Sequence, residues 1–213
     1  MRKDLLTKSV KVTNAQLRHY NSLLRKNLRL VISCSADNEK AQQRIDTMEE
    51  LVFNAPTLKS MFDTLITQGM RIFEIDVVAV SLERPFREHY PEAYQGDEKS
   101  VFLSSDRMLF MDPDEMAAHF SDPLEPVIRG DLLGGTKPFF PNGSGTRIRS
   151  EALAPLYNGR KIIGVAAFGS EKPKRFLEGY GTRFLKRMAR TLTLKAEMFR
   201  VAGPEWNGEK DVL

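Results

Sequence analysis

The chain has 213 residues, of which 41% are hydrophobic and 28% charged, and its net charge at pH 7 is +4. This length and composition indicate a soluble globular protein of one domain plus an extension, and so mild a positive charge argues against a dedicated nucleic-acid binder. Cys34 is the one cysteine, which excludes a disulfide within the chain and a zinc site built from several cysteines.

Targeting and membrane signals are also missing. The N-terminus is charged and has no apolar segment of signal-peptide length. No apolar run approaches the ~18 residues that are needed to span a bilayer. We therefore expect a cytoplasmic protein with no membrane partner.

The first element expected is a long helix. Residues 1–12 are expected to be flexible, and residues 13–53 contain neither Pro nor Gly. Apolar side chains recur every seven residues from Leu17, with companions three positions later; nine of these eleven positions are apolar. This heptad pattern predicts that residues 13–54 pair with a second copy as a parallel or antiparallel coiled coil. The residues expected in the interface are Leu17, Leu24, Val31, Ile45, Met48 and Val52. The alternative is a helix, broken near 33–38, that folds back on its own domain.

Residues 55–202 are expected to form the domain, and 203–213 a tail. Asn54 and Pro56 suggest a helix start, with Asn54 as the cap and Pro56 in the first turn. The following segments are predicted in chain order: a helix to Phe73, a strand at 75–82, a polar loop at 83–99, two short strands within 101–111, and a helix from Asp112-Pro113 through Phe120.

The second half of the domain is predicted to hold most of the sheet. A strand is expected within 124–130, followed by a Gly- and Pro-rich loop that reaches Arg149. Two apolar strands flank Asn158-Gly159, the strongest short-range signal for a β-hairpin. A final helix opens at Gly181-Thr182. Because short turns join most strands, we predict an α+β fold with a mainly antiparallel sheet and a helical layer on one face.

A ligand pocket is predicted on the other face of the sheet. Strand 162–168 alternates so that Ile162, Gly164, Ala166 and Phe168 share one side, and the two small residues leave room above the sheet. Loops 83–99 and 130–149 are placed to cover that room, and Arg129, Arg147, Arg149 and Ser150 beside these loops are placed to hold an anion. The candidate ligand-binding residues are Arg129, Phe139, Arg147, Arg149, Ser150, Gly164, Ala166 and Phe168.

No catalytic residue, metal ligand or cofactor is assigned from the sequence. Ser144 and Ser170 lack the spacing of a nucleophile elbow, and the three histidines form no metal-binding pair. The last helix carries a basic cluster, which is either a solvated helix face or a contact for phosphates. Its members are Arg183, Lys186, Arg187 and Arg190.

Three segments carry a resemblance to a known family: "SEALAPL", "GVAAFGSEKPKRF" and "GYGTRFLKRMARTL". They are similar to the bacterial GAF-like family known as domain of unknown function 484, with Gly169-Ser170, Pro173, Arg175-Phe176 and Gly181-Thr182 at the motif positions. The resemblance implies a GAF-like sheet, related to that of PAS domains, preceded by a helical segment. For the segment from Gly169 to Phe176 we predict a structural role, with Phe176 packed and Arg175 reaching a helix end or a carboxylate.

The function that the resemblance implies is a binding role. GAF domains bind cyclic nucleotides, tetrapyrroles or other metabolites, or pair with each other. The cyclic-nucleotide motif and a bilin-anchoring cysteine have no counterpart here, and GAF proteins that reduce methionine sulfoxide need domain cysteines. We expect a non-enzymatic, homodimeric sensing or scaffold module that takes a small molecule and signals to a separate, unidentified partner protein. The alternatives are an enzyme that uses the sheet-face pocket, and a protein-interaction or DNA-associated factor that uses the basic last helix.

Overall fold

The computed structural model describes residues 2–89, 107–122, 124–140, 145–177 and 182–202. The chain divides into two compact units, Met1–Gln43 and Arg44–Leu213. Helix α1 (Arg2–Phe53) supplies the first unit and the beginning of the second. It begins at Arg2, so residues 2–12, expected to be flexible, are helical, and the break considered near 33–38 is not there. The tail 203–213 and most of loop 83–99 lie outside the described residues.

A five-stranded sheet forms the centre of the second unit, in the order β2-β1-β5-β4-β3. Its strands are β1 (Val77–Glu83), β2 (Met108–Met111), β3 (Val127–Arg129), β4 (Ser150–Asn158) and β5 (Lys161–Ser170). The predicted antiparallel pairing is confirmed for β1–β5, β5–β4 and β4–β3, whereas β1 and β2 pair in parallel. The sheet is therefore mixed, because the long segment between β1 and β2 allows a crossover connection.

The sequence predicted a helix with Asn54 as its N-cap and Pro56 in its first turn. Helix α2 (Leu58–Phe73) begins three residues later than that. Its N-cap is Thr57, whose hydroxyl accepts from the Ser60 amide while the Ser60 hydroxyl accepts from the Thr57 amide, each at 3.1 Å. The prediction of Asn54 as cap was wrong, because Asn54 directly follows the end of α1 and donates its amide to the Glu50 carbonyl of that helix. A reciprocal capping pair of this kind satisfies two otherwise unpaired donors.

Two further helices and two short 3-10 segments complete the fold. Helix α3 (Pro113–Ala117) has Asp112 at its N-cap position, as predicted, but ends before Phe120. Helix α4 (Arg183–Ala202) is the last helix described. The 3-10 segments are η1 (Arg84–His89) and η3 (Gly145–Arg147).

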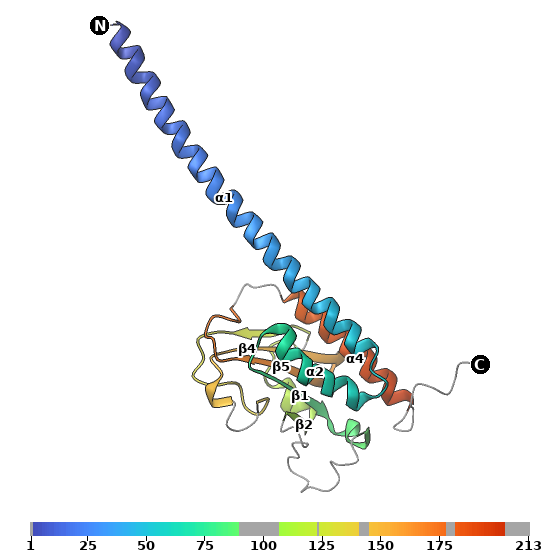
Figure 1. Ribbon diagram of the computed structural model, residues 1–213. Coiled ribbons are helices and arrows are strands. Elements are labelled where there is room, and N and C mark those ends of the chain that lie inside the picture. Colours follow the sequence, from blue (N-terminus) through green and yellow to red (C-terminus); the bar gives the residue numbers. More distant parts are fainter. Residues whose placement is uncertain (1, 90–106, 123, 141–144, 178–181, 203–213) are drawn as a thin grey trace, which may run out of the picture. The chain divides into compact units, whose positions relative to one another are not determined.

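One face of the sheet is covered by α2, α4 and the last turns of α1. Figure 1 shows α2 and α4 on the same side of the sheet. The core on this face includes Met48, Phe62, Val80 and Leu192, all buried. Phe168 of β5 packs edge to face against Phe73, with 5.9 Å between the ring centroids. The predicted helical layer is thus confirmed.

The opposite face has its own core, formed without a long helix. Met116 of α3 packs there together with Phe139, Phe140 and Ile148, which come from the segment between β3 and β4. The expectation that loop 130–149 covers this face is confirmed.

A β-bulge in the β4–β5 hairpin changes which side chains share a face. The hairpin turns at Asn158-Gly159 as predicted, with Gly159 at a φ of 63°. Tyr157 pairs with Ile162 and Leu156 pairs with Gly164, so Ile163 is an extra residue in β5. Ile162 consequently joins the opposite-face core. The prediction that Ile162 shares a side with Gly164 was wrong, because the bulge reverses the alternation.

Candidate functional site

The room predicted above Gly164 and Ala166 is filled by protein. These residues lie under the helical layer, where Ala166 and Phe168 are buried in the core. A Cβ on Gly164 would lie 2.7 Å from the Ser81 carbonyl oxygen and 2.9 Å from Leu82 Cδ2. Small residues at these positions allow close packing of the strands. The prediction of open space for a ligand above Gly164 and Ala166 was therefore wrong.

The other five predicted ligand-binding residues lie in separate surroundings. Phe139 is buried in the opposite-face core. Arg147 forms an exposed ion pair with Glu171 at 3.3 Å, and Arg149 is exposed. Ser150 is buried and its hydroxyl donates to the Lys172 carbonyl at 2.7 Å. The structure therefore does not assemble the predicted set into one site.

Arg129 belongs to a polar cluster around the buried Glu151 that we call the Glu151 cluster, made of Arg129, Thr136 and Glu151. The Glu151 side chain is fully buried and accepts hydrogen bonds from the Thr136 amide at 2.7 Å, from the Thr136 hydroxyl at 2.5 Å and from Arg129 Nη1 at 3.4 Å. Arg129 also donates to the Thr136 hydroxyl at 2.9 Å. The cluster attaches the loop after β3 to strand β4, so Arg129 has a protein carboxylate as its partner.

The segment from Gly169 to Phe176 has the structural role predicted for it. Ser170 at the end of β5 donates its hydroxyl to Asp76 Oδ2 at 2.7 Å. Arg175 donates to the Phe73 carbonyl at the end of α2 at 2.8 Å, and Phe176 packs against the core of the helical layer. Burial lowers the pKa of Arg175 from its ordinary value. The predicted contact of Arg175 with a helix end is confirmed.

A groove of about 690 Å³ lies at the β2 edge of the sheet, and we call it the β2–α3 groove. Its lining comes from the start of η1, from β2, from α3 and the turn after it, and from the loop before Phe139. The lining residues are Arg84, Leu109, Phe110, Met111, Glu115, His119 and Pro138.

The β2–α3 groove combines an apolar floor with charged groups at its rim. Leu109 and Met111 are only 6% and 5% exposed. Arg84 at the rim forms an ion pair with Asp112 at 3.3 Å, and the His119 ring packs edge-on against Phe139 with 4.9 Å between centroids. Such a surface suits a small molecule with an apolar body and a polar end.

Sequence reasoning missed every residue that lines this groove. The one predicted residue near it is Phe139, whose ring packs against the ring of His119. The available signal was the helix start at Asp112-Pro113, directly after an apolar strand, which places Glu115 in α3 and His119 in the turn that follows it.

The predicted coiled-coil interface is divided between two environments. Leu17, Leu24 and Val31 are exposed in the first unit. By contrast, Ile45, Met48 and Val52 are buried in the helical-layer core of the second unit. The prediction that these last three side chains face another chain was wrong, because their own domain covers them.

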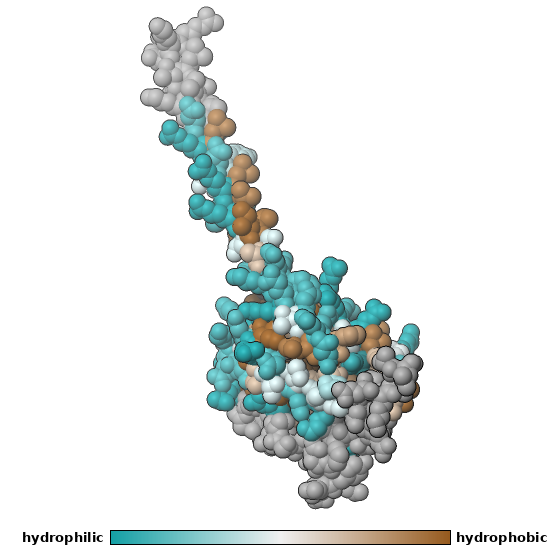
Figure 2. Space-filling view, turned by 45° about the vertical axis from the view of Figure 1, so that its right-hand side comes forward, coloured by the Kyte–Doolittle hydropathy of each residue, from teal (hydrophilic) through white to brown (hydrophobic). Residues whose placement is uncertain are grey.

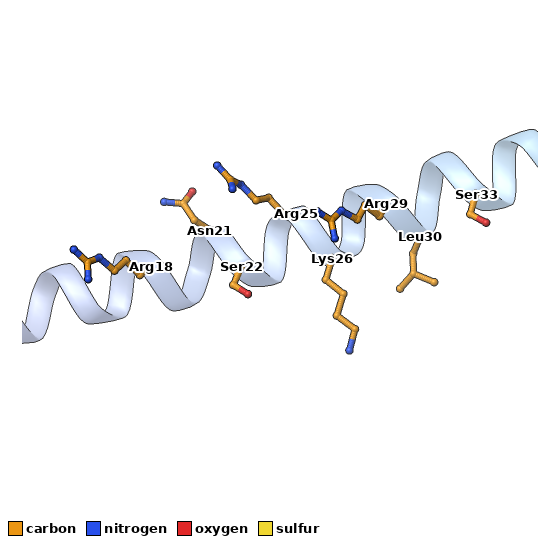
Figure 3. Close-up of a pocket in the computed structure, with 8 residues that line it drawn as sticks. All are labelled: Arg18, Asn21, Ser22, Arg25, Lys26, Arg29, Leu30 and Ser33. Atoms are coloured by element: carbon orange, nitrogen blue, oxygen red, sulfur yellow. The ribbon is translucent and has the colours of Figure 1, made fainter.

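Figure 2 shows hydrophobic side chains in a row along the helix of the first unit, with hydrophilic side chains beside them. Five exposed side chains of this helix, Leu17, Tyr20, Leu24, Leu28 and Val31, recur at helical spacing, and we call them the apolar stripe of α1. A hollow on another side of the helix is lined by Arg18, Arg25, Arg29 and their neighbours (Figure 3). Because every lining residue belongs to one helix, this hollow has no opposing wall.

The basic cluster of α4 is partly neutralised within the second unit. Arg187 pairs with Asp46 at 2.8 Å and with Glu49 at 2.5 Å, and Lys186 pairs with Glu125 at 2.5 Å. The hydrogen bond that Arg187 donates to the Glu49 carboxylate raises the pKa of Arg187 above its ordinary value. These contacts favour a solvated helix face over a phosphate-binding one.

Two searches of the described ranges gave negative results. No helix among these residues is long and apolar enough to cross a membrane. In the same part of the chain, no three His, Cys, Asp or Glu side chains are grouped so that they would hold a metal ion.

Solved structures share the fold at low sequence identity. The free methionine-R-sulfoxide reductase of Neisseria meningitidis, solved with its substrate, is 17% identical, with a TM-score of 0.53 over 76% of this chain and 92% of that chain. The GAF domain of a phosphoenolpyruvate-protein phosphotransferase from Coxiella burnetii is 10% identical, with a TM-score of 0.55 over 78% and 97%. The corresponding Acinetobacter domain is 13% identical, with a TM-score of 0.50 over 76% and 96%. The second unit therefore has a GAF-like fold.

No curated protein matches the sequence. A family model described as "Protein of unknown function, DUF484" matches residues 8–201. Since this match spans most of the sequence and both units, the chain belongs to the DUF484 family.

Proposed function

We propose that this chain is a non-enzymatic, cytoplasmic GAF-like module that binds a small molecule in the β2–α3 groove, pairs with a second copy through α1 and signals to a separate partner protein. The observation that carries the proposal is the groove itself, with its apolar floor of Leu109 and Met111 and its polar rim of Arg84 and Glu115. These features serve binding: the floor removes apolar surface from water, and the rim orients a polar end.

The groove is also placed where occupancy would affect the fold. His119 contacts Phe139, which belongs to the opposite-face core together with Val165 and Ala167 of β5. A ligand that favours one packing of this core over another would shift the population between them, which is how binding becomes a signal.

A groove-filling substitution tests the ligand site. Glu115→Trp places a large side chain on the lining, and Asp114→Trp places the same side chain on the neighbouring, non-lining position of α3. Native mass spectrometry of protein purified from its own host is expected to show a retained small molecule with the wild type and with Asp114→Trp. We expect its occupancy to fall at least about tenfold with Glu115→Trp, because filled space excludes the ligand.

Either of two results would contradict the ligand site. The same molecule retained by Glu115→Trp would place the ligand elsewhere. Wild-type protein that carries nothing, and whose melting temperature responds to no member of a metabolite panel, would remove the sensing role.

Pairing through α1 is supported by the five exposed side chains of the apolar stripe, since a continuous apolar row at heptad spacing is typical of a helix that is covered by another. Leu24→Asp is expected to halve the molar mass measured by light scattering, because it places a carboxylate in the stripe. Ser22→Asp, on the polar side of the same turns, is the control and should leave a dimer. A monomeric wild type, or a dimeric Leu24→Asp, would contradict pairing by this route.

A further inference from the structure

The mild net charge of the chain conceals a strong asymmetry along it. Residues 1–36 contain eight Lys and Arg against one acidic residue, Asp4, and thus carry +7. Because the whole chain carries +4, residues 37–213 carry −3. From Leu5 to Ala36 there is no carboxylate to neutralise the cations. This segment therefore has the charge density of a phosphate-binding element, although the chain as a whole does not.

Among residues 1–36, the arginines whose side chains the structure describes share one side of α1. Arg18, Arg25 and Arg29 are separated by seven and four residues, which places them on one helical face. They are exposed and, with Lys26, they make up what we call the cationic face of α1. Asn21 and Ser22 lie between Arg18 and Arg25, and Ser33 lies one turn beyond Arg29 (Figure 3); all three are donors of the kind that contact phosphate oxygens. The arginines extend over about 17 Å of helix, at 1.5 Å per residue.

Pairing leaves this cationic face outward. The apolar stripe centres on Leu24 and Leu28, and the arginines lie beside it, so a second helix on the stripe does not cover them. Each pair of helices then presents two rows of cations that repel each other, and an anionic polymer relieves that repulsion. An anionic membrane would need the apolar stripe itself, which pairing occupies.

We propose that the cationic face of α1 binds the phosphate backbone of double-stranded DNA without base selectivity; this inference rests on the pairing proposed above. A duplex fits better than a single strand, because single-strand binders stack bases on aromatic side chains. The one Phe, Tyr or Trp side chain between Arg18 and Arg29 is Tyr20, which lies in the apolar stripe.

The test is salt-dependent binding of the full chain to a fluorescent 20-base-pair duplex of arbitrary sequence. The variant is Arg18→Gln/Arg25→Gln/Arg29→Gln, in which glutamine keeps a high helix propensity. The matched control, Lys174→Gln/Arg183→Gln/Arg190→Gln, removes three exposed charges from the second unit. We expect the α1 variant to make the slope of log Kobs against log[NaCl] shallower by about 2.7 per bound chain, at about 0.9 for each lost phosphate contact. The control should retain the wild-type slope.

Several outcomes would overturn this proposal. One is a wild type that does not bind the duplex in 50 mM NaCl. Another is loss of binding with the second-unit control but not with the α1 variant, which would assign DNA contact to α4 and the segment before it. A third is binding to vesicles of anionic phospholipid in preference to DNA. Light scattering separates the failures: a dimer that ignores DNA contradicts this inference alone, whereas a monomer that binds vesicles contradicts the pairing as well.

Discussion

Ile45→Ala is expected to lower the free energy of unfolding of the second unit by about 2–5 kcal/mol, because it leaves a cavity in a closely packed core. Ile45 is 5% exposed and packs in the helical-layer core with Met48 and Val52. The measurement is urea denaturation of dilute protein, with hydrogen exchange of the β4–β5 hairpin as a local readout. The molar mass should stay that of the wild type.

Leu24→Ala is the matched control, since Leu24 occupies the same heptad position three repeats earlier. It is 61% exposed, so its truncation should change the stability of the hairpin by less than about 0.5 kcal/mol. The conclusion that Ile45 packs into its own domain whereas Leu24 does not would be refuted if both variants destabilised the hairpin equally. It would also be refuted if Ile45→Ala gave a stable monomer, because the interface between chains would then continue through Ile45.

The heptad pattern shows what periodicity can and cannot predict. It correctly predicted that residues 13–53 are helical and that one side of the helix is apolar. It could not predict what covers that side, because burial against another chain and burial against the same domain select the same residue types. The boundary between the two lies between Val31 and Ile45, where the residues of α1 begin to pack into the domain core.

Signals in short stretches of sequence predicted the hairpin and the contact of Arg175 with a helix end. Features that depend on the pairing of distant segments were not predicted. Asn158-Gly159 determines a turn by its own conformational preference. By contrast, the extra residue Ile163 has no sequence marker, and it reverses the alternation from which the pocket was predicted. The β2–α3 groove brings together residues from Arg84 to Pro138. Its existence depends on the parallel pairing of β2 with β1, which no local sequence pattern predicts.

Averages over the chain also hide information. The net charge of +4 argued against nucleic-acid binding, but it combines a strongly basic first segment with an acidic remainder. The arginines of α4 drew attention because they are clustered, yet Arg187 is held by two carboxylates of its own unit. Arg18, Arg25 and Arg29 are less conspicuous in the sequence and become a face only on a helix.

Glu151→Ala is expected to cost about 3 kcal/mol of unfolding free energy. Its carboxylate is fully buried on β4 and accepts from the amide and hydroxyl of Thr136 and from Arg129. Removing it leaves the Thr136 amide and the Arg129 guanidinium without that acceptor. Breaking a buried pair costs about 3–5 kcal/mol, and the lower value applies because the Arg129 side chain is 39% exposed and is still reached by water.

Glu171→Ala is the matched control for that loss, because Glu171 also pairs with an arginine, Arg147, but on the surface, with side-chain exposures of 46% and 69%. An exposed pair contributes about 0–1 kcal/mol, so the two substitutions should differ by about 2–3 kcal/mol in urea denaturation. Hydrogen exchange should also rise at Thr136, which is attached to β4 through Glu151. Equal effects of the two variants would mean that burial adds nothing to the Glu151 cluster. The loop that covers the second face would then be held mainly by the packing of Phe139, Phe140 and Ile148 and by backbone hydrogen bonds such as that from the Leu132 amide to the Arg149 carbonyl.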